Sequence, residues 1–281
     1  MGSPDIPPFD IENNRIPEIY PDREIFTERF RELQKQNFFI ADIHVHSAQS
    51  DGIHSLKSIA VKCMDLGISA AVTDHNRVPD LNGLSSREAA SLIPAIEVTS
   101  REGVDVLCYF YDFSALGKFF HEVVAPNKKN TYKITLTCEE ILLALKERKC
   151  VVNIPHPDYP ADSLRKNFLR LIEQGELSSE ALSVINCIEI FNSSRDRSIK
   201  ETKKNLALRL GKFITVGSDA HTKTAVGNAL TFCKTKSQAE FLDHLATCQT
   251  GSIVVSTSTV DRSIPKVKMG WLHIKGLLTG R

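Results

Sequence analysis

Several features that would mark a specialised class of protein are missing from this chain. Its 35 Lys and Arg residues are balanced by 34 Asp and Glu residues, and the formal net charge is +1. A strong positive field is therefore absent, and this predicts no general nucleic-acid binding and no attraction to a membrane surface. Its seven cysteines are odd in number and form no C-x-x-C pair, which excludes a disulfide scaffold. They are typical of small buried side chains in a reducing compartment.

Signals for export or membrane insertion are also missing. No stretch of the sequence approaches the roughly 20 consecutive apolar residues of a membrane span. The first ten residues contain neither the basic nor the apolar segment of a signal peptide. We therefore expect a cytoplasmic protein without membrane contact.

What the chain does contain is an alternation of strand-like and helical patterns. The expected strands are residues 38–43, 68–73, 93–98, 104–110, 150–154, 184–191, 213–216 and 252–255. The expected helices are residues 25–36, 55–66, 139–149, 163–174, 196–210 and 238–248. Nearly continuous apolar strands separated by helices indicate parallel β-α-β units. The pattern predicts an α/β fold, either a (β/α) barrel that is regular or distorted, or a doubly wound open sheet.

The expected organisation is one barrel domain with additions. Residues 1–37 are predicted as an N-terminal arm and helix, residues 38–260 as the barrel domain, and residues 261–281 as a basic tail. Residues 111–136 are too long and too mixed for a simple connection, so we expect an inserted, lid-like segment.

Two histidines follow the first expected strand at a spacing that suits a metal ion. His44 and His46 are two residues apart, and residues two apart on a strand point to the same side. The nearby Ser50-Asp51-Gly52 adds the carboxylate of Asp51. Imidazole and carboxylate together suit Zn²⁺, Mn²⁺ or Fe²⁺. The pair is weak evidence by itself, because such pairs also arise by chance.

The same pattern recurs at other strand ends, and this repetition carries more weight than any one member. In a β/α barrel the carboxyl ends of the strands meet at one face, where active sites form. The sequence therefore predicts a polynuclear metal site from the side chains that lie at such ends: His44, His46, Asp51, His75, Glu97, His156, Asp219 and His221.

In this order, the motifs resemble those of the PHP (polymerase and histidinol phosphatase) family. They are D-x-H-x-H and S-D-G between Asp42 and Gly52, T-D-H ending at His75, a strand-ending Glu97, H-P at His156, and G-S-D-A-H ending at His221. The resemblance covers about residues 38–230 and implies a distorted (β/α)₇ barrel that hydrolyses phosphoesters with two or three divalent ions, Zn, Mn or Fe. The S-D-G motif and the small size resemble stand-alone members that act on nucleotides or other small phosphates.

The resemblance also implies how the ligands are shared. His44, His46, Glu97 and Asp219 would hold one ion, and Asp51, His75 and His221 would hold a second. Glu97 would also bridge to a further ion, which it would share with His156. Family members usually supply one more His before the H-P motif, but none occurs between Val98 and Phe120. Asp105 is the expected substitute.

The expected function is that of a metal-dependent phosphoesterase, a phosphatase or phosphodiesterase of class EC 3.1. Its substrate would be small and phosphorylated, a nucleotide or another phosphomonoester. Two ions ~3.5–4 Å apart would activate a bridging water as hydroxide and clamp the reacting oxygens. Asp74 is a candidate proton relay, and Arg77 and Arg195 are candidate phosphate ligands, because Arg binds phosphate in a bidentate manner. The alternatives are an amidohydrolase-like metal-dependent hydrolase and a non-catalytic metal-binding module.

Overall fold

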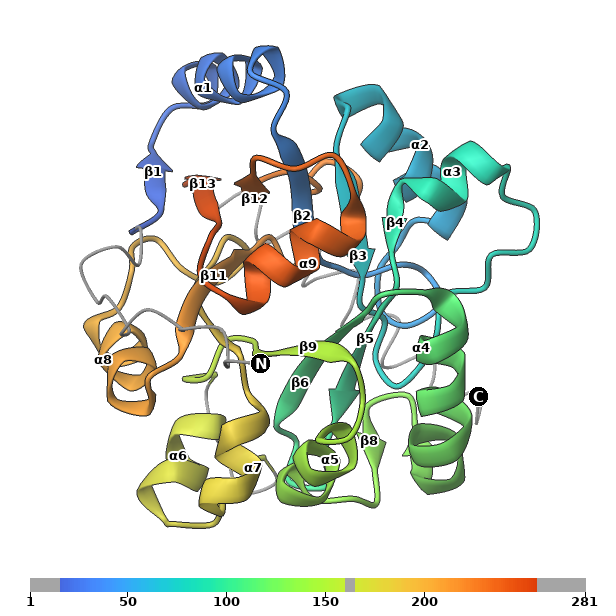
Figure 1. The fold of residues 1–281 in the computed structure, drawn as a ribbon, viewed down its shortest axis with the longest axis vertical. Helices are drawn as coiled ribbons and strands as arrows, with labels where there is room; N and C mark the ends of the chain where they lie inside the picture. Colours follow the sequence, from blue (N-terminus) through green and yellow to red (C-terminus); the bar gives the residue numbers. More distant parts are fainter. Residues whose placement is uncertain (1–15, 160–164, 257–281) are drawn as a thin grey trace, which may run out of the picture.

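The computed structural model describes residues 16–159 and 165–256. The first 15 residues of the expected arm and the whole expected tail, 261–281, lie outside the described residues. Two β-sheets occupy the middle of the molecule, and most of the helices lie around them (Figure 1). The α/β class expected from the sequence is confirmed.

Each sheet mixes strands of both directions. The first sheet has six strands, in the order β1 (Glu18–Tyr20), β13 (Gly251–Val255), β12 (Ala229–Cys233), β2 (Phe39–Val45), β3 (Ser69–Val72) and β4 (Leu92–Ile93). The second has five, in the order β11 (Phe213–Gly217), β10 (Cys187–Asn192), β9 (Cys150–Ile154), β6 (Asp105–Phe110) and β5 (Ala95–Thr99). A separate hairpin consists of β7 (Lys128–Asn130) and β8 (Lys133–Ile134).

Local sequence signals set the helix boundaries. The helices are α1 (Arg23–Lys35), α2 (Leu56–Leu66), α3 (Ser86–Ala90), α4 (Phe113–Phe119), α5 (Cys138–Leu145), α6 (Phe168–Glu173), α7 (Ser179–Val184), α8 (Glu201–Leu210) and α9 (Gln238–Ala246). Thr137 and Glu140 form a capping box that begins α5. The left-handed Gly67, with φ of 66°, ends α2.

The expectation of purely parallel β-α-β units is wrong. β6 runs antiparallel to both of its neighbours, β5 and β9. β12 likewise runs antiparallel to β2 and to β13. The segment between β5 and β6 spans only residues 100–104, which allows a hairpin but is far too short for a crossover helix.

The expected barrel is not closed within the described residues. The two sheets meet through two isolated bridges, Val45 with Ala220 and His75 with Glu97. The register shifts between Asp42 and Val45 interrupt the β2 ladder just before the first bridge. Such irregularities bend a strand and end its regular pairing, so the sheets touch here without forming a continuous ladder.

One end of the space between the sheets is filled by α9, which crosses in front of the strands in Figure 1. Its Phe241, Leu242 and Leu245 form one buried cluster with small and branched side chains of both sheets, among them Ala71 and Leu107. Among the described residues, no helix is long and apolar enough to cross a membrane.

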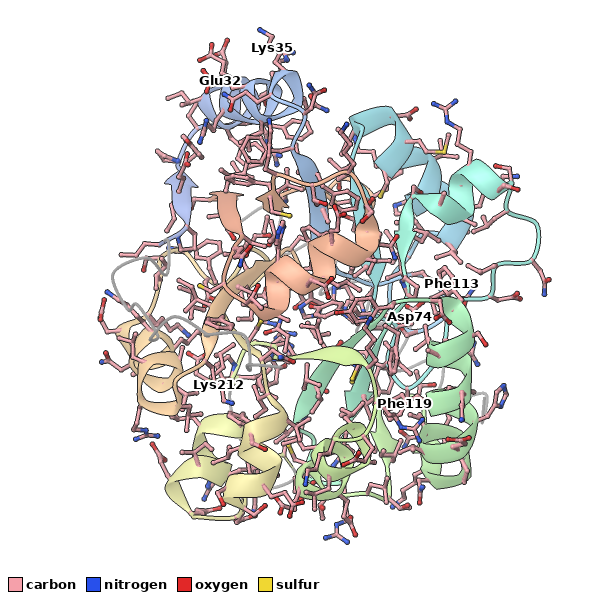
Figure 2. All side chains as sticks on the ribbon, in the orientation of Figure 1. Glu32, Lys35, Asp74, Phe113, Phe119 and Lys212 are labelled. Atoms are coloured by element: carbon pink, nitrogen blue, oxygen red, sulfur yellow. The ribbon has the colours of Figure 1, made fainter. Side chains whose placement is uncertain are left out.

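The expected insertion contains α4, a π-helical turn (Phe120–Val124), a 3₁₀ turn (Ala125–Asn127) and the β7–β8 hairpin. Phe119, labelled in Figure 2, lies on the side of α4 that faces the strands and is fully buried. Leu116 and Val124 are buried in the same hydrophobic cluster. The first half of the insertion is therefore part of the core, and a lid could include only its second half.

Candidate metal centre

Six of the eight predicted ligands lie at the two seams where the sheets meet. Ala220, which bridges to Val45, is flanked by Asp219 and His221, while Val45 is flanked by His44 and His46. At the other seam His75 and Glu97 themselves form the bridge. The sequence places acidic and imidazole groups on both sides of each seam, and the fold thereby gathers them.

Glu97 lies at the centre of the cluster. Its Oε2 is 3.2 Å from His46 Nε2, 3.4 Å from His75 Nδ1 and 3.6 Å from His44 Nε2. Its Oε1 is 3.5 Å from His156 Nε2. One carboxylate thus faces four imidazoles from three different strand ends.

Asp219 and Asp51 complete the set of carboxylates. Oδ1 of Asp219 is 3.3 Å from His46 Nε2 and 3.6 Å from His44 Nε2. Asp51 places Oδ1 3.4 Å from His46 Nδ1, and its Oδ2 3.3 Å from His221 Nε2 and 3.5 Å from His75 Nε2. His46 therefore contacts all three acidic side chains.

These contacts define four overlapping groups whose potential ligand atoms all lie within 4.8 Å of one another: His44, Glu97 and His156; His44, His46 and Asp219; His46, Asp51 and His221; His46, His75 and Glu97. All eight side chains predicted from the sequence belong to them. Asp105, the expected substitute for a missing His, belongs to none of these groups and is 3.4 Å from Arg165 Nη2.

The cluster has an inner end and an outer end. The inner end consists of His44, Glu97 and His156, whose side chains are 0%, 0% and 5% exposed. The outer end consists of Asp51, His75 and His221, whose side chains are 8%, 13% and 9% exposed. Solvent and small molecules therefore reach the cluster more readily from the outer end.

Unpaired polar atoms show that the donor set fits a cation. His44 Nε2, His46 Nδ1 and both carboxylate oxygens of Glu97 are buried without a hydrogen-bond partner among the described residues. Burying such atoms unsatisfied is costly. A divalent ion among them would satisfy nitrogen and oxygen donors at once, and this mixed set suits Zn²⁺, Mn²⁺ or Fe²⁺ better than Ca²⁺.

Charges in the cluster shift the titration of its members. Burial lowers the pKa of His44, but neighbouring carboxylates, above all Glu189, outweigh it and raise this pKa well above the ordinary value. Burial raises the pKa of Asp219, but the Arg195 guanidinium and nearby imidazoles bring it well below its usual range. Ionised carboxylates are ready ligands, and a bound cation displaces the protons that the imidazoles would hold.

Backbone strain is concentrated at the same strand ends. Asn76, His156 and Asp219 adopt left-handed conformations with φ of 49°, 29° and 51°. Such conformations are uncommon for residues other than glycine and cluster at functional sites. At His156 and Asp219 the turn delivers a predicted ligand to the cluster.

The sequence analysis missed Glu189, which supports the inner end from β10. Its Oε1 is 2.9 Å from His44 Nδ1, while its Oε2 accepts hydrogen bonds from the His156 backbone N–H at 2.9 Å and from Asn192 Nδ2 at 3.0 Å. A carboxylate on Nδ1 orients the ring and directs Nε2 toward the cluster. The sequence did contain a signal for Glu189, which is a charged residue within the apolar run Cys187–Asn192. Charged groups are rarely buried unless they are paired, so such a residue indicates a buried partner.

Gly217 makes room for this contact. A Cβ at this position would lie 2.0 Å from Glu189 Oε1 and 2.8 Å from His44 Cβ. Both atoms belong to buried side chains, so any larger residue would displace the pair. The first glycine of the G-S-D-A-H motif therefore has a packing role.

Asp42 and Asp74 neighbour predicted ligands in the sequence, but their carboxylates accept hydrogen bonds from backbone and serine groups and not from imidazoles. Asp74, near the middle of the view in Figure 2, accepts hydrogen bonds from Ser47 N at 2.8 Å and Ser47 Oγ at 2.6 Å, and from Ser50 Oγ at 2.5 Å. Asp42 accepts from the Gly227 backbone N–H at 2.8 Å, and burial raises its pKa to about 6. Asp74 thus holds the loop that carries Asp51.

Arg195 borders the cluster. Its Nε donates to Asp219 Oδ2 at 2.8 Å, and its guanidinium lies 4.3 Å from the centre of the Tyr159 ring. The side chain is 32% exposed, so it is accessible as well as fixed. Arg77 is exposed. The pKa of Lys128, in the β7–β8 hairpin, is lowered mainly by burial of the lysine and further by the positive charge of Arg77.

Comparison with family models finds one match, to the family described as PHP-associated, over residues 201–250. This segment contains both Asp219 and His221. Comparison with curated proteins finds no sequence match.

Solved structures share the fold at low sequence identity. PsfC from Pseudomonas syringae matches with a TM-score of 0.56 and 18% identity, over 84% of this chain and 99% of the other. A two-domain protein from Bacteroides vulgatus, which contains a predicted PHP-like metal-dependent phosphoesterase, matches with a TM-score of 0.53 and 16% identity, over 83% and 70% of the two chains. Together with the family match, these findings confirm the resemblance drawn from the motifs.

The expectation of no general nucleic-acid binding is wrong, because the low net charge does not exclude a nucleic-acid substrate. Endonuclease Q, in a complex with a 27-mer duplex substrate that has an abasic lesion at the active site, shares the fold with a TM-score of 0.54 and 17% identity, over 74% of this chain and 56% of the other. Net charge was a poor guide because an enzyme contacts nucleic acid through local groups at its site, whatever the sum over the whole chain.

Proposed function

We propose that this chain is a metal-dependent phosphoesterase of the PHP type, on the basis of the side-chain cluster and of the match to the PHP-associated family over residues 201–250. The observation that supports this most is the sharing of ligands: the four groups overlap at His44, His46 and Glu97. Overlapping ligand sets suit a centre of two or three ions, an arrangement found in many enzymes that hydrolyse phosphoesters.

The eight clustered side chains would hold the ions: His44, His46, Asp51, His75, Glu97, His156, Asp219 and His221. When bound, divalent ions neutralise charge on the phosphoryl oxygens and make a water acidic enough to attack at neutral pH. Glu97 and Asp219 would supply negative charge that holds the cations, and Glu189 keeps the His44 ring in one tautomer.

Arg195 is proposed to bind the phosphate of the substrate. Asp219 and the Tyr159 ring fix its guanidinium, so little side-chain freedom is lost when a ligand binds. Arg77, which is exposed, is proposed to attract anionic substrate from further away. We propose that Asp74 positions Asp51 through the 47–51 loop in place of relaying protons, because hydrogen bonds from Ser47 and Ser50 engage both of its oxygens.

The substrate is proposed to be a nucleotide or another phosphate ester. The experiment measures release of inorganic phosphate from nucleotides and sugar phosphates, and separation of the cleavage products of phosphodiesters and oligonucleotides, with Mn²⁺ or Zn²⁺ supplied. His44→Ala and Asp219→Ala are the test variants. His121→Ala, which removes an exposed imidazole outside the four groups, is the matched control.

Hydrolysis of a phosphoester that is lost in both test variants and kept in the control supports the proposal. Cleavage of amides or carboxylic esters without any phosphoester hydrolysis would favour an amidohydrolase-like enzyme instead. Stoichiometric metal binding with no turnover of any substrate class would leave a metal-binding module.

A further inference from the structure

The outer end of the cluster restricts where a substrate can extend. The inner end is almost entirely covered by protein, since His44 and Glu97 have no exposed side-chain surface and the His156 side chain is 5% exposed. The non-reacting part of a bound substrate therefore extends from the cluster past more accessible groups, such as those around His75 and Asp51. Side chains that line this exit contact the substrate and influence which esters are accepted.

One aromatic ring stands beside that exit. Tyr132 lies between β7 and β8, and its ring centre is 5.7 Å from that of His75, with 60° between the planes. It is the outermost member of a row of rings, since His75 is 4.9 Å from His46, which is 5.2 Å from His44. Tyr132 is 38% exposed and is among the few large hydrophobic residues on the described surface.

Asn76 fixes the hairpin that carries this tyrosine. Its Nδ2 donates to the Thr131 carbonyl at 3.0 Å, and its own carbonyl accepts from Lys128 Nζ at 2.9 Å. Its Oδ1 accepts from the Thr99 backbone N–H at 3.0 Å. Because Asn76 is buried and directly follows His75, the same residue sets the position of the hairpin and of the outer end.

Two cations belong to the elements that meet at Asn76. Lys128, which begins the hairpin, donates to the Asn76 carbonyl at 2.9 Å, and the exposed Arg77 directly follows Asn76 in the chain. An exposed aromatic ring beside a cluster that fits divalent ions matches a ligand with two properties: a planar ring and negative charge. A nucleotide has both.

We propose that Tyr132 is a specificity-determining residue that stacks against the base of a nucleotide whose phosphate lies at the metal cluster. This inference rests on the proposed function and adds the chemical class of the group that is esterified to the phosphate, which is a nucleoside. Asn76 is the positioning residue, because it holds the hairpin without facing the ligand.

The experiment measures binding without turnover, on the metal-loaded chain. The probes are a nucleoside 5′-methylenephosphonate and the same sugar phosphonate without a base, and calorimetry gives the affinity of each. The wild-type protein binds the base-bearing probe more tightly. Tyr132→Ala lowers the ratio of the two affinities by about 5- to 100-fold, the usual effect of losing one base-stacking ring, whereas Tyr132→Phe retains the ratio because the ring remains.

Asn76→Gly keeps the left-handed backbone accessible and removes the side-chain hydrogen bonds, so it lowers the same ratio. Val61→Ala, at an exposed position on α2, is the control and leaves it unchanged. Equal affinity of the wild-type protein for the two probes would overturn the inference, as would an unchanged ratio in Tyr132→Ala. Failure of the proposed function has a different signature: the base preference persists, but no phosphoester is hydrolysed.

Discussion

The inner and outer ends of the cluster contain the same types of side chain but differ in their support. At the inner end His44 has a buried carboxylate, Glu189, on its second nitrogen. At the outer end the nearest acceptors to the Nδ1 atoms are neutral: the Thr99 hydroxyl is 3.0 Å from His75 Nδ1, and the Asp219 carbonyl is 2.8 Å from His221 Nδ1. Carboxylates of the cluster lie further from the same nitrogens, at 3.4 Å for Glu97 and 3.6 Å for Asp219. A charged acceptor strengthens a ligating imidazole more than a neutral one does.

This difference indicates a division of labour. If the proposed function holds, we expect the deeply buried end, where a carboxylate orients His44, to retain its ion, and the more accessible outer end to exchange its ion and to contact the substrate. The loop that carries Asp51 is held by hydrogen bonds from two serines to Asp74, so the outer end depends on a loop where the inner end depends on strands. Four substitutions test the comparison.

His44→Ala is expected to have the largest effect, because His44 belongs to two of the ligand groups at the buried end. Phosphoesterase activity should fall at least about a thousandfold, equivalent to about 4 kcal/mol of transition-state stabilisation. The bound metal, measured by elemental analysis, should fall as well. Full metal content in a folded His44→Ala variant would show that the inner end does not hold an ion.

Asp51→Asn should affect the outer end alone. The loss of one anionic ligand is expected to remove one equivalent of metal while the inner ion stays, and to lower kcat/KM about a hundredfold, or about 2.7 kcal/mol. Native mass spectrometry counts the ions directly. The division between the ends would be refuted if every ion left together.

Glu189→Gln keeps the shape of the side chain and removes its charge. The affinity of the inner ion should fall about 10- to 100-fold, as is usual when the partner of a ligating histidine is changed. Competition with a chelator measures this affinity, and Glu201→Gln, at an exposed position on α8, is the control. An affinity equal to that of the wild-type protein would show that the charge of Glu189 is not needed.

Thr99→Val should have the smallest effect, since it removes only a neutral hydroxyl from His75. The change in kcat/KM is expected to be about fivefold, equivalent to about 1 kcal/mol for one hydrogen bond. Steady-state kinetics with saturating metal provides the measurement. A loss as large as that of Asp51→Asn would mean that the partner of His75 matters as much as a ligand does.

The eight clustered side chains could be selected from the sequence because most of them lie within a few residues of a strand end. Strands such as Cys150–Ile154 have continuous apolar runs, and the residue that follows such a run is directed by the sheet itself. Once an α/β fold with converging strand ends is assumed, His156 and Asp219 must approach each other, even though they are far apart in the chain.

Features that depend on distant pairing could not be predicted in this way. The contact between His44 and Glu189 spans 145 residues and depends on the order of the strands, which hydrophobic periodicity does not encode. The expected strand at 184–191 began too early, because Ser178 caps a helix that continues to Val184. The antiparallel β12 was not anticipated at all, since a single short strand shows no sign of the direction of its partner.

The most direct test of the central claim is the number of divalent ions bound per chain. The metal-free protein is titrated with Mn²⁺ or Zn²⁺, and bound metal is counted by elemental analysis after removal of free ions. We predict at least two equivalents for the wild-type protein, one fewer for Asp51→Asn, and an unchanged count for the exposed control His121→Ala. A wild-type protein that is folded and binds no ion would contradict the account.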